Sequence, residues 1–130
     1  MSDIVKISIV DDDPSAREGT KDLVRAFGFD VEAFQSGKEF LASDRVRSTS
    51  CLIADVRMPE MTGLELYERL VELGNTIPTI LMTAYADDGD YARARRAGVI
   101  FYMVKPFDDQ ELLSSILSAI GGRTDGGPEQ

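Results

Sequence analysis

The sequence of 130 residues contains no histidine, no tryptophan and a single cysteine, Cys51. Without histidine the chain cannot build a Ser-His-Asp or Cys-His catalytic group, and it cannot offer imidazole to zinc or iron. One cysteine excludes an internal disulfide and a thiolate cage for a metal. Polar chemistry is therefore left to carboxylates, hydroxyls and lysine, which are suited to hard cations.

Basic residues are also scarce, because 14 Lys and Arg stand against 23 Asp and Glu, for a net charge of −9. This balance disfavours binding to nucleic acid, where Lys and Arg must neutralise phosphates. No apolar run approaches the ~18 residues that span a bilayer, and the first residues do not resemble a signal peptide. The length fits one domain, and we expect a soluble protein in the cytoplasm.

Short runs rich in β-branched residues alternate with longer amphipathic segments, and they predict strands over 5–10, 31–34, 51–54, 79–82 and 99–104. A helix is predicted after each strand, including one over 86–97 that ends at Gly98. Helix-start signals are found at Asp13-Pro14, at Ser36, at Thr62 and at Asp108. Five β-α units predict an α/β fold of the flavodoxin-like type: a doubly wound (βα)5 domain whose five-stranded parallel sheet has strand order 2-1-3-4-5.

The predicted domain covers residues 1–120. The segment that follows, 121–130, is rich in glycine. Glycine-rich segments behave as flexible chains, so we expect a flexible tail or the start of a linker over these residues.

Polar side chains follow four of the predicted strands at the point where each strand ends: Asp11-Asp12-Asp13, Asp55, Thr83 and Lys105. In an open parallel sheet, ligands bind outside the carboxyl ends of the strands, where the strand order reverses. This switch point lies between strands one and three, so we expect Asp11 and Asp12 beside Asp55. Carboxylates ~4 Å apart repel by about 4 kcal/mol per pair at an effective dielectric near 20, which a divalent cation and Lys105 would offset.

Oxygen ligands without histidine or cysteine favour Mg²⁺, which also accepts oxygens from a phosphate. A carboxylate can attack phosphorus to give an aspartyl phosphate. Asp55 is the best candidate for this nucleophile, because it comes from the central apolar strand, where its position is most rigid. Asp11 and Asp12 would hold the metal, whereas Lys105 and the hydroxyl of Thr83 would each bind a phosphoryl oxygen.

Four motifs together identify a family: Ile9-Val10-Asp11-Asp12-Asp13, Asp55-Val56-Arg57-Met58-Pro59-Glu60-Met61-Thr62-Gly63, Met82-Thr83-Ala84-Tyr85 and Lys105-Pro106-Phe107. Over about residues 4–120 the chain resembles the receiver domain of bacterial two-component response regulators, and the second motif is most similar to the nitrogen-fixation regulator (FixJ-like) subfamily. The resemblance implies that a sensor histidine kinase phosphorylates Asp55. It also implies Mg²⁺ bound by Asp11, Asp12, Asp55 and the backbone carbonyl of Arg57, and a cis peptide bond before Pro106.

The resemblance further implies a switch rather than an enzyme, with Mg²⁺-dependent self-phosphorylation from small donors and self-dephosphorylation. Thr83 would move toward the phosphoryl group and Tyr102 would swing inward. The surface formed by the helix over 86–97, the strand over 99–104 and the last helix would then change and bind a partner or form a homodimer. We expect the exposed part of this surface to lie around Ala94, Ala97, Val99, Phe101 and Tyr102.

The subfamily usually carries a C-terminal helix-turn-helix domain, so a role in transcription regulation would require a longer natural protein. At positions 57 and 85, which tune the lifetime of the phosphoryl group in this family, the chain has Arg and Tyr. The lifetime therefore cannot be predicted by analogy.

Three other functions are compatible with parts of the sequence. A phosphatase of the haloacid-dehalogenase type would also form an aspartyl phosphate, but it needs a second acid where this chain has Arg57. A flavin-binding module of similar topology would require a hydroxyl-rich phosphate loop in place of the acidic cluster after the first strand. A docking domain that works without phosphorylation would not need Asp11, Asp12, Asp55, Thr83 and Lys105 together.

Overall fold

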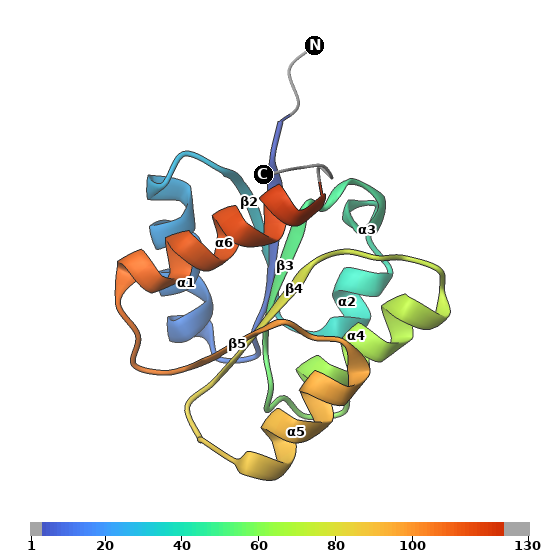
Figure 1. The fold of residues 1–130 in the computed structure, drawn as a ribbon. Helices are drawn as coiled ribbons and strands as arrows, with labels where there is room; N and C mark the ends of the chain where they lie inside the picture. The colour runs from blue at the N-terminus through green and yellow to red at the C-terminus, as the bar shows by residue number, and fades with distance from the viewer. Residues whose placement is uncertain (1–3, 124–130) are drawn as a thin grey trace.

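A five-stranded parallel sheet forms the centre of the molecule in the computed structural model, which describes residues 4–123. The strands are β1 (Lys6–Val10), β2 (Asp30–Phe34), β3 (Cys51–Asp55), β4 (Thr79–Thr83) and β5 (Phe101–Val104). They pair in the order β2-β1-β3-β4-β5, and every pairing is parallel (Figure 1). This arrangement confirms the predicted doubly wound, flavodoxin-like α/β fold.

Helices cover both faces of the sheet: α1 (Pro14–Ala26), α2 (Gly37–Leu41), α3 (Arg45–Ser48), α4 (Gly63–Glu72), α5 (Asp88–Ala97) and α6 (Asp109–Arg123). Helices α1 and α6 lie on one face, and α2, α4 and α5 lie on the other (Figure 1). No helix in the described part of the chain is long and apolar enough to cross a membrane.

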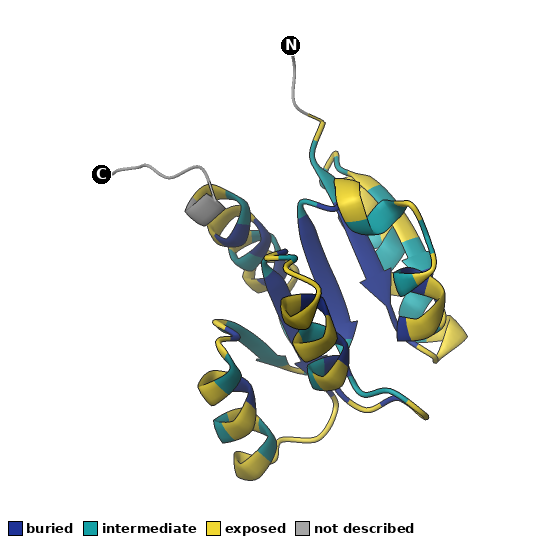
Figure 2. Ribbon diagram, turned by 90° about the vertical axis from the view of Figure 1, so that its right-hand side faces the viewer, coloured by how far each residue is buried: buried dark blue, intermediate teal, exposed yellow. Residues whose placement is uncertain are grey.

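The sheet separates two apolar cores, because successive side chains of a strand point to opposite faces. On one face, Ile53 and Ile80 pack with Leu112 and Ile116 of α6; on the other, Leu81 packs with Leu66 of α4 and with its neighbours. The central strands β1, β3 and β4 are accordingly buried, the edge strands β2 and β5 are partly exposed, and the outer faces of the helices are exposed (Figure 2). Cys51 is fully buried in the first core, and this burial raises the pKa of its thiol to about 12.

Local side-chain caps explain where several helices begin. The Asp13 carboxylate accepts a hydrogen bond from the amide of Ala16 at 3.2 Å, with Pro14 in the first helical position. Thr62 and Glu65 form a complete capping box at the start of α4, in which each side chain accepts from the other residue's amide. Such caps stabilise a helix by about 1 kcal/mol each. The sequence signals for these starts are confirmed.

Helix α5 and strand β5 both begin later than the sequence predicts. Asp87 caps the helix by accepting from the amide of Asp90 at 3.0 Å, so α5 begins at Asp88 rather than at residue 86. At the other end the amide of Val99 donates to the carbonyl of Ala94, while Gly98 adopts a φ of 107°. Because the amide of Val99 is bonded within this helix-ending turn, it does not pair with the neighbouring strand, and β5 begins at Phe101.

Because of this turn, the prediction that Ala94 and Val99 lie on an exposed surface is wrong. Ala94 is 1% exposed and Val99 is 2% exposed, because both lie in the core beneath the helix end. The exposed apolar side chains in this region are instead Tyr91, Ile100 and Val104.

Two further differences concern the helices. The four-residue helix α3 was not predicted, since it is too short to show an apolar period. Helix α6 continues to Arg123, three residues into the segment predicted as a tail. The remainder of that segment, 124–130, lies outside the described residues.

Candidate functional site

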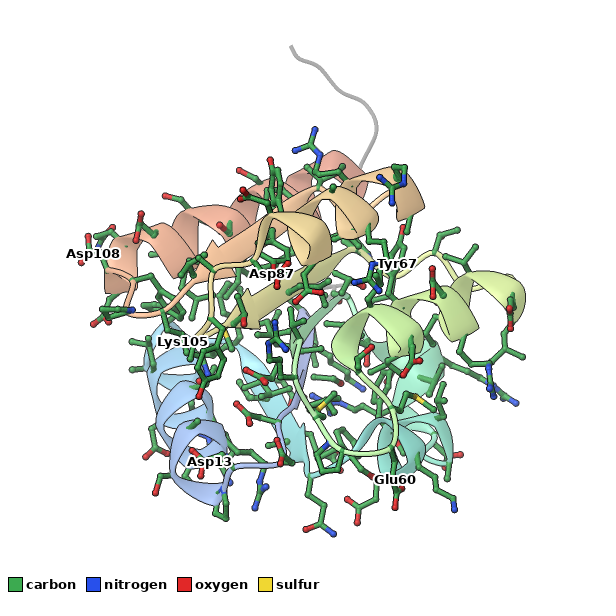
Figure 3. The ribbon with its side chains drawn as sticks, turned by 90° about the horizontal axis from the view of Figure 1, so that it is seen from below. Asp13, Glu60, Tyr67, Asp87, Lys105 and Asp108 are labelled. Atoms are coloured by element: carbon green, nitrogen blue, oxygen red, sulfur yellow. The ribbon has the colours of Figure 1, made fainter. Side chains whose placement is uncertain are left out.

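Three carboxylates lie together at the carboxyl ends of β1 and β3. These strands are neighbours, with Val10 opposite Ala54, so the residues that follow them meet at one edge of the sheet. One oxygen from each of Asp11, Asp12 and Asp55 lies within 4.8 Å of the others. Figure 3 looks onto this edge, where Asp13, Lys105 and Asp87 project from the surrounding loops.

The carboxylates open into a shallow pocket of about 190 Å³, lined by Asp11, Asp12, Asp13, Ala16, Asp55, Arg57, Ala84, Tyr85 and Lys105. The lining comes from four loops, each of which follows a different strand of the sheet. Asp12 is exposed at the mouth of the pocket, whereas Asp11 is buried. The pocket therefore combines an accessible opening with a carboxylate at its base that water reaches poorly.

Asp11 is the most buried of the three acids, with 2% of its surface exposed. Its Oδ1 accepts from the amide of Asp13 at 3.0 Å, but its buried Oδ2 has no hydrogen-bond donor. Burial raises the pKa of Asp11, and the neighbouring charges of Asp55 and Asp12 raise it further, against the opposing effects of the Asp13 amide and Lys105. A buried carboxylate oxygen that has no hydrogen-bond donor and lies beside two other carboxylates is a position that a cation would satisfy.

Lys105 supplies the positive charge of the pocket. Its Nζ lies 3.3 Å from Oδ1 of Asp55 and 3.7 Å from Oδ2 of Asp11. The residue is held by a hydrogen bond from its amide to the carbonyl of Thr83 at 2.8 Å and is followed by a cis peptide bond to Pro106. Three carboxylates and one ammonium leave two negative charges, which matches the charge of one divalent cation.

Asp55 is held in place by its own loop. Its Oδ2 accepts from the amide of Arg57 at 3.1 Å, and Oδ1 faces Lys105. The backbone behind it is fixed as well, because the amide of Gly63 donates to the carbonyl of Val56 and that of Val56 donates to the carbonyl of Met82. Asp55 therefore presents a carboxylate from a rigid strand end.

Thr83 ends the neighbouring strand β4 and is 1% exposed. Its hydroxyl donates to the carbonyl of Tyr85 at 3.2 Å and accepts from the amide of Tyr85 at 3.1 Å. It is not part of the pocket lining, so the structure brings Asp11, Asp12, Asp55 and Lys105 together but leaves the Thr83 hydroxyl engaged with its own loop.

Tyr102 lies on β5, outside the acidic pocket, with its ring edge-to-face against Tyr91 at 5.3 Å between centroids. The ring packs against the core, and its hydroxyl is buried without a hydrogen-bond partner. Burial raises the pKa of this hydroxyl, and the charges of Asp90 and Asp87 raise it further. The Tyr102 ring thus faces the interior in this structure.

The sequence predicts a metal-binding backbone carbonyl at Arg57 and an influence of this position on the phosphoryl lifetime, but not the contacts that its side chain makes. The guanidinium pairs with Asp90 at 2.8 Å and lies over the ring of Tyr85. No sequence pattern joins Arg57 to Asp90, because the two residues are 33 positions apart, one in the loop after β3 and the other in the first turn of α5.

Asp11→Asn is expected to stabilise the metal-free protein at neutral pH by about 1 kcal/mol, because it removes a buried charge that repels two others. The raised pKa of Asp11 means that the folded state disfavours the ionised form. The native protein therefore loses stability relative to the variant as the pH rises from below 3.8 through the raised pKa. Urea unfolding of both proteins between pH 3 and 7, without Mg²⁺, measures the difference. Asp22→Asn, the same change on the exposed face of α1, serves as the control, and a less stable Asp11→Asn protein at pH 7 would contradict the prediction.

Comparison with known proteins gives one consistent result. Residues 7–117 match the family described as "Response regulator receiver domain". The chain is 41% identical over 114 residues to response regulator protein TodT of Pseudomonas putida. The aligned segment covers 88% of this chain and 50% of TodT. The chain is 33% identical over 114 residues to transcriptional regulatory protein FixJ of Bradyrhizobium diazoefficiens, covering 88% of this chain and 56% of FixJ. The chain thus spans about half the length of the curated relatives it matches.

Solved structures agree with the sequence matches. The crystal structure of FixJ-N superposes with a TM-score of 0.84 at 34% identity, covering 93% of this chain and 96% of that one. The structure of response regulator StyR superposes with a TM-score of 0.83 at 40% identity, covering 91% of this chain and 60% of that one. The fold and the sequence therefore have the same relatives.

Proposed function

Since this chain belongs to the family of response regulator receiver domains, the signalling switches of two-component systems, we propose that it is a phosphoacceptor whose state is set at Asp55. The observation that carries this proposal is the pocket itself. It gathers three carboxylates from two adjacent strand ends around one lysine, with Asp55 within 3.3 Å of that lysine. Such a group suits phosphoryl transfer, which depends on positioning and charge neutralisation.

The proposed reaction uses the Asp55 carboxylate as the nucleophile. A carboxylate oxygen attacks the phosphorus of a phosphohistidine on a sensor histidine kinase, the new O–P bond forms, and the N–P bond breaks. The histidine nitrogen leaves with the electron pair of that bond and takes up a proton from water. The donor must be external, because this chain has no histidine. With acetyl phosphate as donor, acetate leaves instead.

The same pocket fits Mg²⁺, held by Asp11, Asp12 and Asp55 together with the backbone carbonyl of Arg57. The buried Oδ2 of Asp11, which has no hydrogen-bond donor, and the two excess negative charges support this assignment. When bound, the ion would neutralise charge on the phosphoryl oxygens. Lys105 would pair with one of those oxygens once its contact to Oδ1 of Asp55 is released.

The proposed output is a change on the surface formed by α5, β5 and α6. Thr83 would exchange its hydrogen bonds to Tyr85 for one to the phosphoryl group. The ring of Tyr102, on β5, would then change its position. Between β5 and α6 lies an open groove lined by Tyr102, Met103, Val104 and Phe107 and by α6 side chains, a surface suited to a second copy or an output domain. The name of the relative FixJ supports an output in transcription, and the match to only about half of each relative supports a further domain that carries this output. A cytoplasmic location is part of the same proposal.

We expect the purified protein to gain one phosphoryl group from acetyl phosphate in the presence of Mg²⁺, and to react at least about 100-fold more slowly after chelation by EDTA. Intact mass spectrometry with and without the metal measures the uptake, and light scattering of the same samples tests for dimers. Excess Mg²⁺ added back after chelation is the control and should restore the rate. No uptake with Mg²⁺ present would overturn the proposal, and steady turnover of small phosphate esters would favour a phosphatase.

A further inference from the structure

The side chain of Arg57 joins the Asp55 loop to the beginning of α5. Its amide donates to Asp55, while its guanidinium extends to the other side of the loop and donates to Oδ2 of Asp90 at 2.8 Å. A second acid, Asp87, lies 3.6 Å away, and the guanidinium also lies 5.6 Å from the centroid of the Tyr85 ring. One residue thus contacts the proposed phosphoacceptor through its backbone and the β4–α5 loop through its side chain.

The acids that hold Arg57 are built into the first turn of α5. Asp87 caps the helix through its Oδ1 and offers Oδ2 to Arg57. Asp90 divides its two oxygens between Arg57 and Arg93, and its side chain is only 20% exposed. The contact is therefore more shielded from solvent at Asp90 than an ordinary surface ion pair.

A small cavity of about 90 Å³ lies beneath this contact. Arg57, Asp90 and Arg93 form part of its wall, and Val56, Leu81, Ala94 and Tyr102 form most of the rest. The buried hydroxyl of Tyr102 has no partner. The Arg57 contacts thus close over the residue that the proposed function uses as its aromatic switch, and the cavity leaves room for rearrangement there.

We propose that Arg57 is a positioning residue that latches the β4–α5 loop in the resting form and releases it when Asp55 is phosphorylated. The Arg57 latch consists of Arg57 with Asp87, Asp90 and the ring of Tyr85. The inference rests on the proposed function, in which Thr83 moves toward Asp55. Thr83 is bonded to the backbone of Tyr85, so its movement displaces the loop beneath the guanidinium. A phosphoryl group on Asp55 also offers Arg57 a competing anion.

A double-mutant cycle with Arg57→Gln and Asp90→Asn tests the latch. Urea unfolding of the four proteins is measured without additions and again with Mg²⁺ and beryllofluoride, which mimics a phosphoryl group on a carboxylate. In the resting form we expect a coupling of about two- to fivefold in the unfolding equilibrium constant. With beryllofluoride bound, the coupling should vanish. A role limited to stability would leave the same coupling in both forms.

Linkage gives a second, independent readout. Because the contact stabilises only the resting form, Asp90→Asn should tighten the binding of beryllofluoride by the same factor, about two- to fivefold. Amide hydrogen exchange of residues 84–91 should also be faster in that variant before activation. Asp88→Asn is the matched control, since Asp88 lies in the same helical turn and its side chain makes no hydrogen bond or ion pair within residues 4–123.

The outcomes separate the latch from the function on which it rests. Beryllofluoride can bind the native protein while the Arg57–Asp90 coupling is either absent in the resting form or equal in both forms. Either result overturns the latch and leaves the phosphoacceptor proposal intact. If Asp88→Asn tightens the binding of beryllofluoride as much as Asp90→Asn does, the latch is also overturned. The tighter binding would then come from the loss of any negative charge in this helical turn. Failure of the native protein to bind beryllofluoride with Mg²⁺ overturns the proposed function, and the latch with it.

Discussion

Asp55→Asn is expected to lose at least about 100-fold in the rate of phosphoryl uptake from acetyl phosphate, because the amide is isosteric with the carboxylate but has no nucleophilic oxygen. The fold should remain intact. Asparagine keeps a carbonyl that can accept from the amide of Arg57, and the substitution removes one of three mutually repelling charges. Intact mass spectrometry after incubation with acetyl phosphate and Mg²⁺ measures the uptake, and circular dichroism checks the fold.

Asp22→Asn provides the matched control for this loss, because it removes the same charge from an exposed position on α1, outside the pocket lining. It should accept the phosphoryl group at the native rate. If Asp55→Asn still gained an alkali-labile phosphoryl group at the native rate, the acceptor would lie elsewhere. Peptide mapping would then locate it, and the assignment of Asp55 would be wrong.

Gly63→Ala is expected to destabilise the protein by about 2–3 kcal/mol, the upper part of the range for overpacking a tight site. Gly63 is buried at the first position of α4, and a methyl group there would press against the backbone carbonyl of Asp55. It would also lie 3.1 Å from a methyl carbon of Leu81 in the core. The Asp55 carbonyl belongs to the backbone and cannot rotate away as a side-chain end can, so the strand end that carries Asp55 would have to shift.

Gly19→Ala is the control for the helix effect of the same substitution. Gly19 lies inside α1, and nothing is within 4 Å of the position where its new methyl group would stand. Alanine should therefore stabilise this helix by about 0.5–1 kcal/mol. Urea unfolding of both variants measures the two effects, and phosphoryl uptake by Gly63→Ala should fall along with stability. A Gly63→Ala protein as stable as the native one would show that the strand end is more tolerant than its contacts indicate.

The strand order and the position of the acidic cluster were predictable because each depends on local patterns and one topological rule. Apolar runs predicted the strands, and helix-start residues such as Asp13 and Thr62 predicted where the connecting helices begin. Short loops between these strands and helices indicated a parallel sheet. Once the order was set, Asp11 and Asp55 had to meet at the same edge. The family resemblance then supplied the roles, which composition and spacing alone did not.

Contacts between side chains of different loops were not predictable in the same way. The pairing of Arg57 with Asp90 depends on where the β4–α5 loop passes, and the buried hydroxyl of Tyr102 depends on how the ring packs beneath it. Thr83 shows the same limit, because its predicted role toward a phosphoryl oxygen did not indicate that its hydroxyl bonds to the backbone of Tyr85. The late start of β5 follows from a helix-ending turn that the apolar pattern of residues 99–104 conceals.

The position of the acidic pocket also has a consequence for folding kinetics. Three of the four strand pairings join strands that are consecutive in sequence, and only β1 with β3 crosses over an intervening strand. At the start of these strands the amide of Lys6 donates to the hydroxyl of Ser50, 44 residues away. Such long-range pairing is slow to form, because loop closure must precede the contacts that reward it. Since Asp11 and Asp55 meet only when this pair has closed, a partly folded chain that lacks it has no assembled acceptor site. Newly made protein would thus become competent for signalling only after β1 and β3 have paired.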